Sequence, residues 1–210
     1  MCSTLRQAQG ARRSGVRSSN DAANCSDQLT ALANESGVAR VVACTYDKHA
    51  AAILDILNEA IANSTALYDY QPRAPESMVG WFKAKDAGRF PVIGAVANDL
   101  LVGFASYGTF RAWPAYKYTV EHSVYVHREH RGKGIGIALM HKLIDAAREQ
   151  QYHVMVGGID AANRASVRLH EKLGFFHAGI IRHAGFKFGR WLDLAFYQLL
   201  LETPARPVDG

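Results

Sequence analysis

The residues with the clearest chemical potential form the glycine-rich run Arg-Gly-Lys-Gly-Ile-Gly at 131–136. A β-branched segment at 118–126 precedes this run, and an amphipathic helical pattern follows it. A glycine turn at a helix start directs unpaired backbone N–H groups toward one point, where the helix dipole adds partial positive charge. Arg131 and Lys133 add full charges. The run therefore predicts a site for a phosphorylated ligand.

Two familiar nucleotide-binding motifs do not fit this run. A P-loop would close with Lys-Ser or Lys-Thr, and the Rossmann fingerprint has a different glycine spacing. Neither feature is present at 131–136. We therefore expect a phosphorylated cofactor that is held in a third way.

The surrounding pattern predicts the elements that position this turn. Strand and helix signals alternate along the chain, which favours an α/β fold (α+β mixed sheet) of about seven strands flanked by four helices. The predicted strands are 38–43, 92–97, 101–107, 117–126, 152–156, 176–181 and 191–200, with a turn at Asn98-Asp99. The predicted helices begin near Asp47, Pro75, the glycine turn and Asn163, and Gly88 and Gly174 end the second and fourth.

Length and composition fit one domain with extensions. The 210 residues are 49% hydrophobic, which is enough for a full core, and no apolar run is long enough to cross a membrane. Residues 1–36 are rich in Ser, Ala, Asn and Arg and carry no aromatic residue, so we expect a disordered N-terminal extension. An organellar transit peptide is the alternative for this segment. The folded domain is expected at 37–203 and a short tail at 204–210.

Charge and cysteine content exclude several classes of protein. The net charge of +5 comes partly from arginines near the N-terminus, and these lack interleaved aromatic residues, which argues against nucleic-acid binding. Cys2, Cys25 and Cys44 lack metal-ligand spacing, so we expect no metal site and a reducing, cytoplasmic location.

Four blocks of this sequence resemble a known family. The run at 131–136 matches the Arg/Gln-x-x-Gly-x-Gly/Ala motif of the GNAT acyltransferase superfamily. The blocks at 118–126, 163–175 and 185–191 more narrowly resemble the phosphinothricin and methionine sulfoximine N-acetyltransferases, in the same order. The similarity extends from about Val38 to Pro207. It implies the GNAT fold, acetyl-CoA as co-substrate, no metal, and a homodimer.

The resemblance also implies which residues contact acetyl-CoA. Its pyrophosphate would lie on the N–H groups of Arg131, Gly132, Lys133, Gly134, Ile135 and Gly136. The pantetheine arm would lie beside the strand that contains Val124, Tyr125 and Val126, with a backbone N–H of 123–126 facing the thioester oxyanion. Asn163 and Ser166 would add polar contacts, and the two residues can also cap the helix that they begin.

Acetyl transfer to an amine needs a neutral nitrogen and therefore a base. Glu121 is the candidate, because it lies mid-strand in an apolar context where burial would raise its pKa. The alternative is a carboxylate paired with a nearby arginine. His170 shares one helical stripe with Asn163 and Ser166, and it would act as acid or as second base. A histidine that only packs within its helix is the alternative there.

Basic and aromatic loop residues could form the pocket for the acceptor. Arg111 with Trp113 and Tyr116 would provide a planar cation beside aromatic walls, which suits an amino-acid carboxylate. Tyr68, Lys187 and Trp191 resemble further pocket residues. Each of them could instead serve ordinary loop packing.

These features predict an acetyl-CoA-dependent N-acetyltransferase that acts on the α-amine of a small amino-acid-like acceptor. L-Phosphinothricin and methionine sulfoximine or sulfone are the expected examples, with direct attack on the thioester. The alternatives are a GNAT enzyme for a peptide N-terminus, a lysine or an aminoglycoside, and a non-catalytic CoA-binding module. The natural acceptor stays open.

Overall fold

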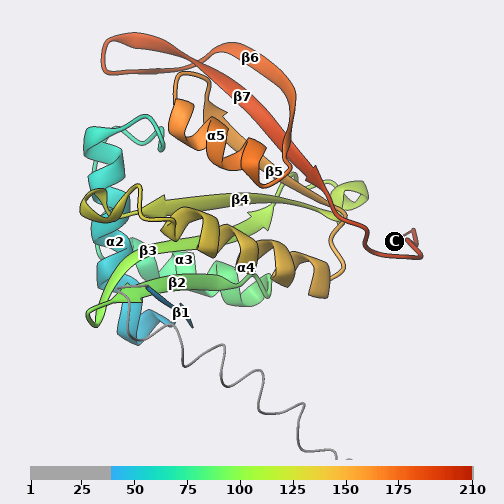
Figure 1. Ribbon diagram of the computed structural model, residues 1–210, viewed down its shortest axis with the longest axis horizontal. Coiled ribbons are helices and arrows are strands. Elements are labelled where there is room, and N and C mark those ends of the chain that lie inside the picture. The colour runs from blue at the N-terminus through green and yellow to red at the C-terminus, as the bar shows by residue number, and fades with distance from the viewer. Residues whose placement is uncertain (1–38, 210) are drawn as a thin grey trace, which may run out of the picture. The chain divides into compact units, whose positions relative to one another are not determined.

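The computed structural model describes residues 39–209, and the predicted extension at 1–36 lies outside the described residues. The described chain forms one mixed sheet with the strand order β1-β2-β3-β4-β5-β7-β6, which confirms the predicted fold class (Figure 1). The strands are β1 (Arg40–Ala43), β2 (Val92–Ala97), β3 (Leu100–Thr109), β4 (Thr119–Val126), β5 (Val154–Asp160), β6 (Phe176–Lys187) and β7 (Arg190–Leu200). The helices are α2 (Tyr46–Asn63), α3 (Ser77–Ala87), α4 (Ile135–Glu149) and α5 (Arg164–Lys172), with short 3-10 turns η1 (Pro114–Tyr116) and η2 (Arg128–His130).

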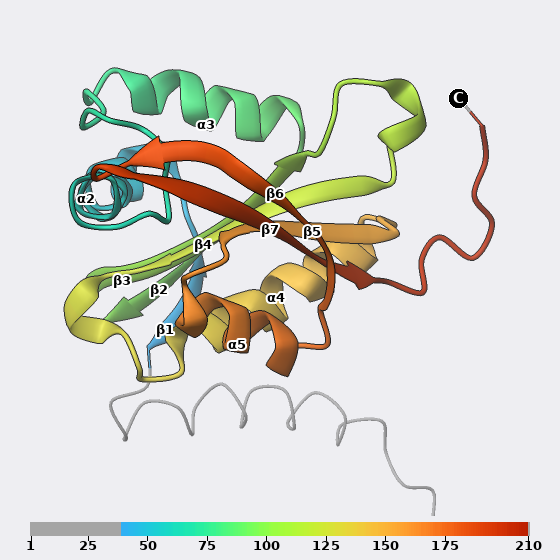
Figure 2. The same cartoon turned by 90° about the horizontal axis from the view of Figure 1, so that it is seen from above.

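The helices cover both faces of the sheet. Helices α2 and α3 lie on one face, and α4 and α5 lie on the other (Figure 2). The apolar stripe of α4, which includes Leu139, Met140 and Leu143, is fully buried in the larger core cluster. Ile53 and Leu57 of α2 belong to a second cluster together with Phe82 of α3. The helical spacing of apolar residues thus gives the two buried layers that hold the sheet between them.

Several local predictions are confirmed. Asn98 and Asp99 both have positive φ values, 50° and 60°, as a tight hairpin turn between β2 and β3 requires. Helix α3 ends at Gly88, and Gly174 follows α5 with a φ of 85°. The side-chain oxygen of Asn163 accepts a hydrogen bond from the N–H of Ser166 at 3.1 Å, which caps α5.

Two predicted strands ended at least four residues too early. Strand β5 begins two residues later than predicted and continues to Asp160, through Gly157 and Gly158, which read as a strand end in the sequence. Strand β6 continues to Lys187 rather than ending at 181. Register shifts near His177 and Ile181 interrupt the alternation of its side chains, so the sequence pattern does not reveal the second half of the strand. The β6–β7 hairpin is therefore longer than the sequence indicates.

Strands β4 and β5 form the one parallel pair in the sheet of residues 39–209, and their pairing is short. It joins Thr119 to Val154, Val120 to Met155 and Glu121 to Val156, and then stops although both strands continue. Beyond Val156, β5 pairs with β7 alone, while β4 still pairs with β3. The two strands therefore separate into a fork with its closed end at the Glu121–Val156 pair. Within residues 39–209, no helix is both long and apolar enough to cross a bilayer.

Candidate active site

The fork between β4 and β5 contains a cavity. Its walls are residues 122–125 of β4 and 157–160 of β5, together with the start of α5 and the loop after α2. The residues that line it include Tyr68, His122, Asp160, Asn163, Ser166 and His170. The structure therefore brings the predicted helical stripe of Asn163, Ser166 and His170 to one cavity with Val124 and Tyr125. Val126 lies one residue beyond that wall, at the end of β4.

The glycine turn lies at the start of α4, as the sequence predicts. Gly132 and Gly134 have φ values of 78° and 79°, and Gly134 is the N-cap of the helix. A side chain would be strained at both positions, although space is open around them. The first N–H groups of α4, from Ile135 onward, lack partners within the helix and are available to an anion.

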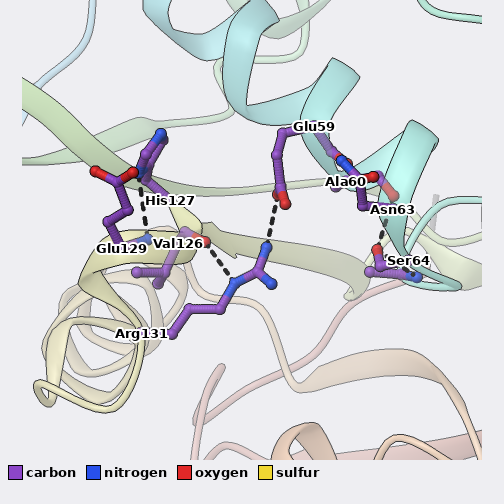
Figure 3. A network of polar contacts seen from close by, with 9 residues as sticks. Glu59, Ala60, Asn63, Ser64, Val126, His127, Glu129 and Arg131 are labelled. Carbon is purple, nitrogen blue, oxygen red and sulfur yellow. Dashed lines mark hydrogen bonds and ion pairs between the residues drawn. The ribbon is translucent and has the colours of Figure 1, made fainter.

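The Arg131 side chain is engaged elsewhere than expected. Its Nε donates to the carbonyl of Val126 at 3.0 Å, and its guanidinium forms an ion pair of 2.7 Å with Glu59 of α2 (Figure 3). The guanidinium is thus paired with a carboxylate although it is half-exposed, and its contact with the phosphate stays a prediction. Lys133 is exposed, and its charge faces solvent at the turn.

Glu121 is half-buried at the closed end of the fork. Burial raises the pKa of its carboxyl, and the nearby positive charge of Arg111 opposes that rise. A Cβ built on Gly158 would lie 3.3 Å from Oε1 of Glu121, whereas a Cβ on Gly157 would lie 3.0 Å from Nε2 of His170. Because consecutive strand residues face opposite sides, the two predicted catalytic side chains lie on opposite faces of β5.

His170 has a partner that the sequence did not indicate. Its Nε2 lies 3.1 Å from Nε2 of His122, and its Nδ1 lies 2.7 Å from the carbonyl of Ser166. Both rings are buried, and they stack with their centroids 5.0 Å apart. The close fit explains Gly157, since a side chain there would collide with both imidazoles.

The predicted acceptor residues fall into separate groups. Arg111, Trp113 and Tyr116 line a second cavity near η1, together with Lys117 and Thr119. The Arg111 guanidinium lies over the Phe110 ring, 4.4 Å from its centroid. Tyr68 is separate from these three residues and lines the fork cavity instead.

Lys187 and Trp191 line neither cavity. Lys187 is only 4% exposed, and its ammonium donates to the carbonyls of Ile61, Ser64 and Leu67 at 2.7, 2.9 and 2.7 Å. All three of its donors are used, so its expected contact with the acceptor is corrected to a bond between β6 and the end of α2. Trp191 is largely exposed and packs edge-on against Phe186.

Sequence reasoning missed Asp160, a buried carboxylate in the wall of the fork. It accepts hydrogen bonds from the Thr65 hydroxyl at 2.5 Å and the Ala162 N–H at 3.0 Å, and forms an ion pair of 3.1 Å with Arg190. These contacts join the loop after α2 to β5 and β7. The partners are more than 25 residues from Asp160 in two of the three cases, so no local pattern could have revealed them.

Comparison with known proteins decides the family. The family described as "Acetyltransferase (GNAT) family" matches residues 52–175, which is more than half of the chain. The chain belongs to the GNAT acetyltransferases. The matched range of this GNAT protein includes most of α2, the glycine turn, the fork and α5.

Curated relatives of this GNAT protein act on amino acids. The L-amino acid N-acyltransferase MnaT of Escherichia coli K12 is 43% identical over 157 residues, which are 75% of this chain and 91% of the relative. The L-methionine sulfoximine/L-methionine sulfone acetyltransferase of Salmonella typhimurium LT2 is also 43% identical, over 75% of this chain and 92% of the relative.

A solved structure extends the likeness to the fold. The GNAT superfamily phosphinothricin acetyltransferase from Sinorhizobium meliloti, in complex with acetyl-CoA, is 33% identical with a TM-score of 0.78. The match covers 82% of this chain and 95% of the other. Within the described part of this chain, no cluster of three or more His, Cys, Asp or Glu side chains could hold a metal ion.

Proposed function

We propose that this GNAT protein transfers the acetyl group of acetyl-CoA to the α-amine of a small amino-acid-like acceptor. Methionine sulfoximine, methionine sulfone and phosphinothricin are the candidate acceptors, because named relatives act on them. The observation that carries the proposal is the fork itself, with an anion-binding turn at one side and the half-buried Glu121 at its closed end.

The residues present fit acetyl-CoA. The glycine turn offers the first N–H groups of α4 to the pyrophosphate. The N–H of His127 donates to the Val102 carbonyl on β3, so strand alternation directs the N–H groups of Val124 and Val126 into the fork. These groups can bind the amide-rich pantetheine as another strand would. When bound, acetyl-CoA supplies the acetyl group and the thiol leaving group.

Glu121 would accept the proton that the acceptor ammonium must lose, directly or through water. The raised pKa of its carboxyl brings it closer to the working pH than an exposed glutamate would be. The neutral amine then attacks the thioester carbon without a covalent enzyme intermediate. The C–S bond breaks, CoA leaves as its thiolate, and the proton that the new amide nitrogen loses passes to that thiolate or to water. Of the backbone donors at 123–126, those of Val124 and Val126 have the orientation to stabilise the oxyanion.

The acceptor carboxylate would bind near Arg111. Arg111 lines the second cavity, and its positive charge lowers the pKa of Glu121 against the effect of burial. Trp113 and Tyr116 provide aromatic walls in the same cavity, and Tyr68 faces the fork from the loop after α2. Arg111 can therefore hold a carboxylate within reach of the proposed base.

We also infer a homodimer in a reducing, cytoplasmic setting. Large apolar side chains of β6, including Ile180 and Ile181, are about half exposed, and an apolar groove lies between them and Tyr116. Exposed apolar surface of this kind marks an interface. Sedimentation equilibrium of the full chain tests it, and a monomer at micromolar concentration would contradict it.

A thiol-release assay with acetyl-CoA tests the proposed function. The panel contains methionine sulfoximine, methionine sulfone, L-phosphinothricin, ordinary amino acids, a peptide with a free N-terminus, and an aminoglycoside. We expect the highest kcat/KM with the first three compounds. A higher value for the peptide or the aminoglycoside would assign a different acceptor class, and no release with any amine, despite acetyl-CoA binding by calorimetry, would indicate a non-catalytic module.

A further inference from the structure

The proposed mechanism leaves a buried pair of imidazoles without an assigned role. His122 of β4 and His170 of α5 are 6% and 2% exposed, and both contribute to the wall of the fork cavity. Phe175 packs edge-on against both rings. A buried hydrogen-bonded pair of this kind has few ways to arrange its protons, because each nitrogen must match its neighbour.

The neighbours determine the tautomer of each ring. A carbonyl oxygen accepts only, so Nδ1 of His170, 2.7 Å from the Ser166 carbonyl, carries a proton. In neutral His170, Nε2 is then unprotonated and can only accept a hydrogen bond. The Nε2 of His122, 3.1 Å away, must supply the proton of that bond. Nδ1 of His122 is left bare, and among residues 39–209 it is a buried nitrogen without a hydrogen-bond partner.

The surroundings keep both rings neutral. Burial lowers the pKa of His122, and the adjacent His170 lowers it further. Burial also lowers the pKa of His170, against the opposing effect of the Ser166 carbonyl. The other titratable side chains next to the pair are phenols, Tyr107 opposite His122 on β3 and Tyr197 beside His170 on β7. Within the described residues, no cation or carboxylate contributes to the change in the pKa of either ring.

We propose that His122 is a positioning residue for His170: its Nε2–H fixes the orientation of a neutral ring whose proton the Ser166 carbonyl keeps on Nδ1 and whose lone pair lies on Nε2. This inference rests on the proposed acetyl transfer. One imidazole proton is bound by the Ser166 carbonyl and the other lies between the two rings. The pair therefore offers no free N–H to a leaving thiolate. Of the two roles open for His170, the acid role is excluded, and its Nε2 serves as a hydrogen-bond acceptor.

Nitrogen spectroscopy tests the tautomers without any substrate. Long-range ¹H–¹⁵N spectra of the full-length protein, labelled at histidine, distinguish a protonated Nδ1 from a protonated Nε2 for each ring. Loss of one set of signals in His122→Gln assigns the residue. We expect Nδ1–H at His170 and Nε2–H at His122 in the wild-type protein. A protonated Nε2 at His170 would overturn the proposal.

Two substitutions test the positioning role. In His122→Gln the amide nitrogen can still donate to Nε2 of His170, so we expect the His170 tautomer to persist and kcat to stay within about threefold. In His122→Met no donor remains for Nε2 of His170, while the Ser166 carbonyl still keeps the proton on Nδ1. We therefore expect the His170 ring to lose its fixed orientation in the wall of the fork and kcat to fall by about 10-fold to 100-fold, with an unchanged Kd for acetyl-CoA. Equal kcat values for the two variants would overturn the proposal. If His122→Met does not fold, His122→Ser takes its place.

The pH profile supplies a readout that packing alone would not change. An acid with a pKa below the ordinary value of 6.5 would be deprotonated above that pH, so kcat would fall as pH rises. We expect no such fall between about pH 6.5 and 9. A descending limb that disappears in His170→Gln would overturn the inference. If wild-type protein acetylates no amine in the panel, the proposed function fails, while the nitrogen spectra still decide the tautomers.

Discussion

The glycine turn at 131–136 and the floor of the fork, made by His122, Gly157, Gly158 and His170, are built in different ways. The turn uses the backbone of consecutive residues, and its shape depends on two glycines with positive φ. The floor uses side chains from β4 and α5 around two glycines of β5. Changes in the turn should therefore alter ligand binding, whereas changes at the floor should alter turnover and stability.

The largest effect is expected at the closed end of the fork. Replacing Glu121 with Gln should lower kcat by about 10²-fold, because the amide cannot accept the ammonium proton. The Kd for acetyl-CoA should change little. The ascending limb of the kcat profile, which burial of Glu121 displaces toward higher pH, should vanish in the variant. Steady-state kinetics across pH and calorimetry measure the two quantities.

Glu171→Gln is the matched control, since this carboxylate is exposed on α5. The variant at 121 should fold normally. In the wild-type protein the native-state pKa of Glu121 is raised, so its charged form opposes folding, and stability rises as pH falls through that pKa. The neutral amide of Glu121→Gln removes this destabilisation by a buried charge. Unchanged turnover of Glu121→Gln would remove Glu121 from the role of base.

The second effect is a loss of stability at the floor. A Cβ in Gly157→Ala would lie 2.8 Å from Nε2 of His122 and 3.0 Å from Nε2 of His170. The rings or β5 must shift, which should lower the free energy of unfolding by about 1–3 kcal/mol. Urea denaturation measures this, with Gly80→Ala as control. Gly80 lies in α3 with nothing within 4 Å of its added Cβ, so about 0.5–1 kcal/mol of stabilisation is expected there.

Equal stability of Gly157→Ala and wild type would show that the imidazole pair is looser than its contacts imply. It would also weaken the contrast between a turn made of backbone and a floor made of fitted side chains.

The two regions also differ in how far the sequence predicts them. The glycine turn, the Asn163 cap and the amphipathic stripe of α4 are local patterns, and the structure confirms each of them. The seven strands and four helices of the described chain follow from such patterns as well. Local signals suffice because each of these features is formed by residues a few positions apart.

Contacts between distant segments could not be predicted in the same way. His122 and His170 are 48 positions apart, and Lys187 binds carbonyls more than 100 positions away. Lys187 and Arg131 were expected to contact ligands, yet both form polar contacts with distant parts of the protein. The double glycine at 157–158 was the available signal. The predicted strand stopped before these two glycines, whereas in the structure the strand continues through them. Glycine is required there because side chains approach closely from both faces of β5.

In the glycine turn, the third effect should appear as weaker binding. Gly134 has a φ of 79°, so Gly134→Ala costs about 1–2 kcal/mol in that conformation. If the turn relaxes, its N–H groups no longer converge on the pyrophosphate, and the Kd for acetyl-CoA should rise by about 5-fold to 30-fold. Calorimetry measures the Kd, and kcat at saturation should be nearly unchanged. A large fall in kcat with normal binding would contradict the division between the two regions.

A smaller effect is expected in the second cavity. Arg111→Ala should raise the acceptor KM by about tenfold and lower kcat less, because a charge-assisted bond to the carboxylate is lost. Removing this positive charge should also raise the pKa of Glu121, so the ascending limb moves to higher pH. Arg111→Lys keeps the charge without the planar fork and should have an intermediate KM. An unaltered KM for Arg111→Ala would assign the carboxylate contact to another residue.

The smallest effect is expected where α2 meets the turn. Glu59→Gln removes the ion-pair partner of Arg131 but leaves the bond from Nε of Arg131 to the Val126 carbonyl. Arg131 is half-exposed, so the pair should contribute at most about 1 kcal/mol to stability. If the backbone of the turn provides the binding site, the Kd for acetyl-CoA should change by less than about threefold, even though the guanidinium is released. A tighter Kd of tenfold or more, with a steeper dependence on salt, would show instead that the freed charge of Arg131 can bind phosphate, and that Glu59 normally withholds it.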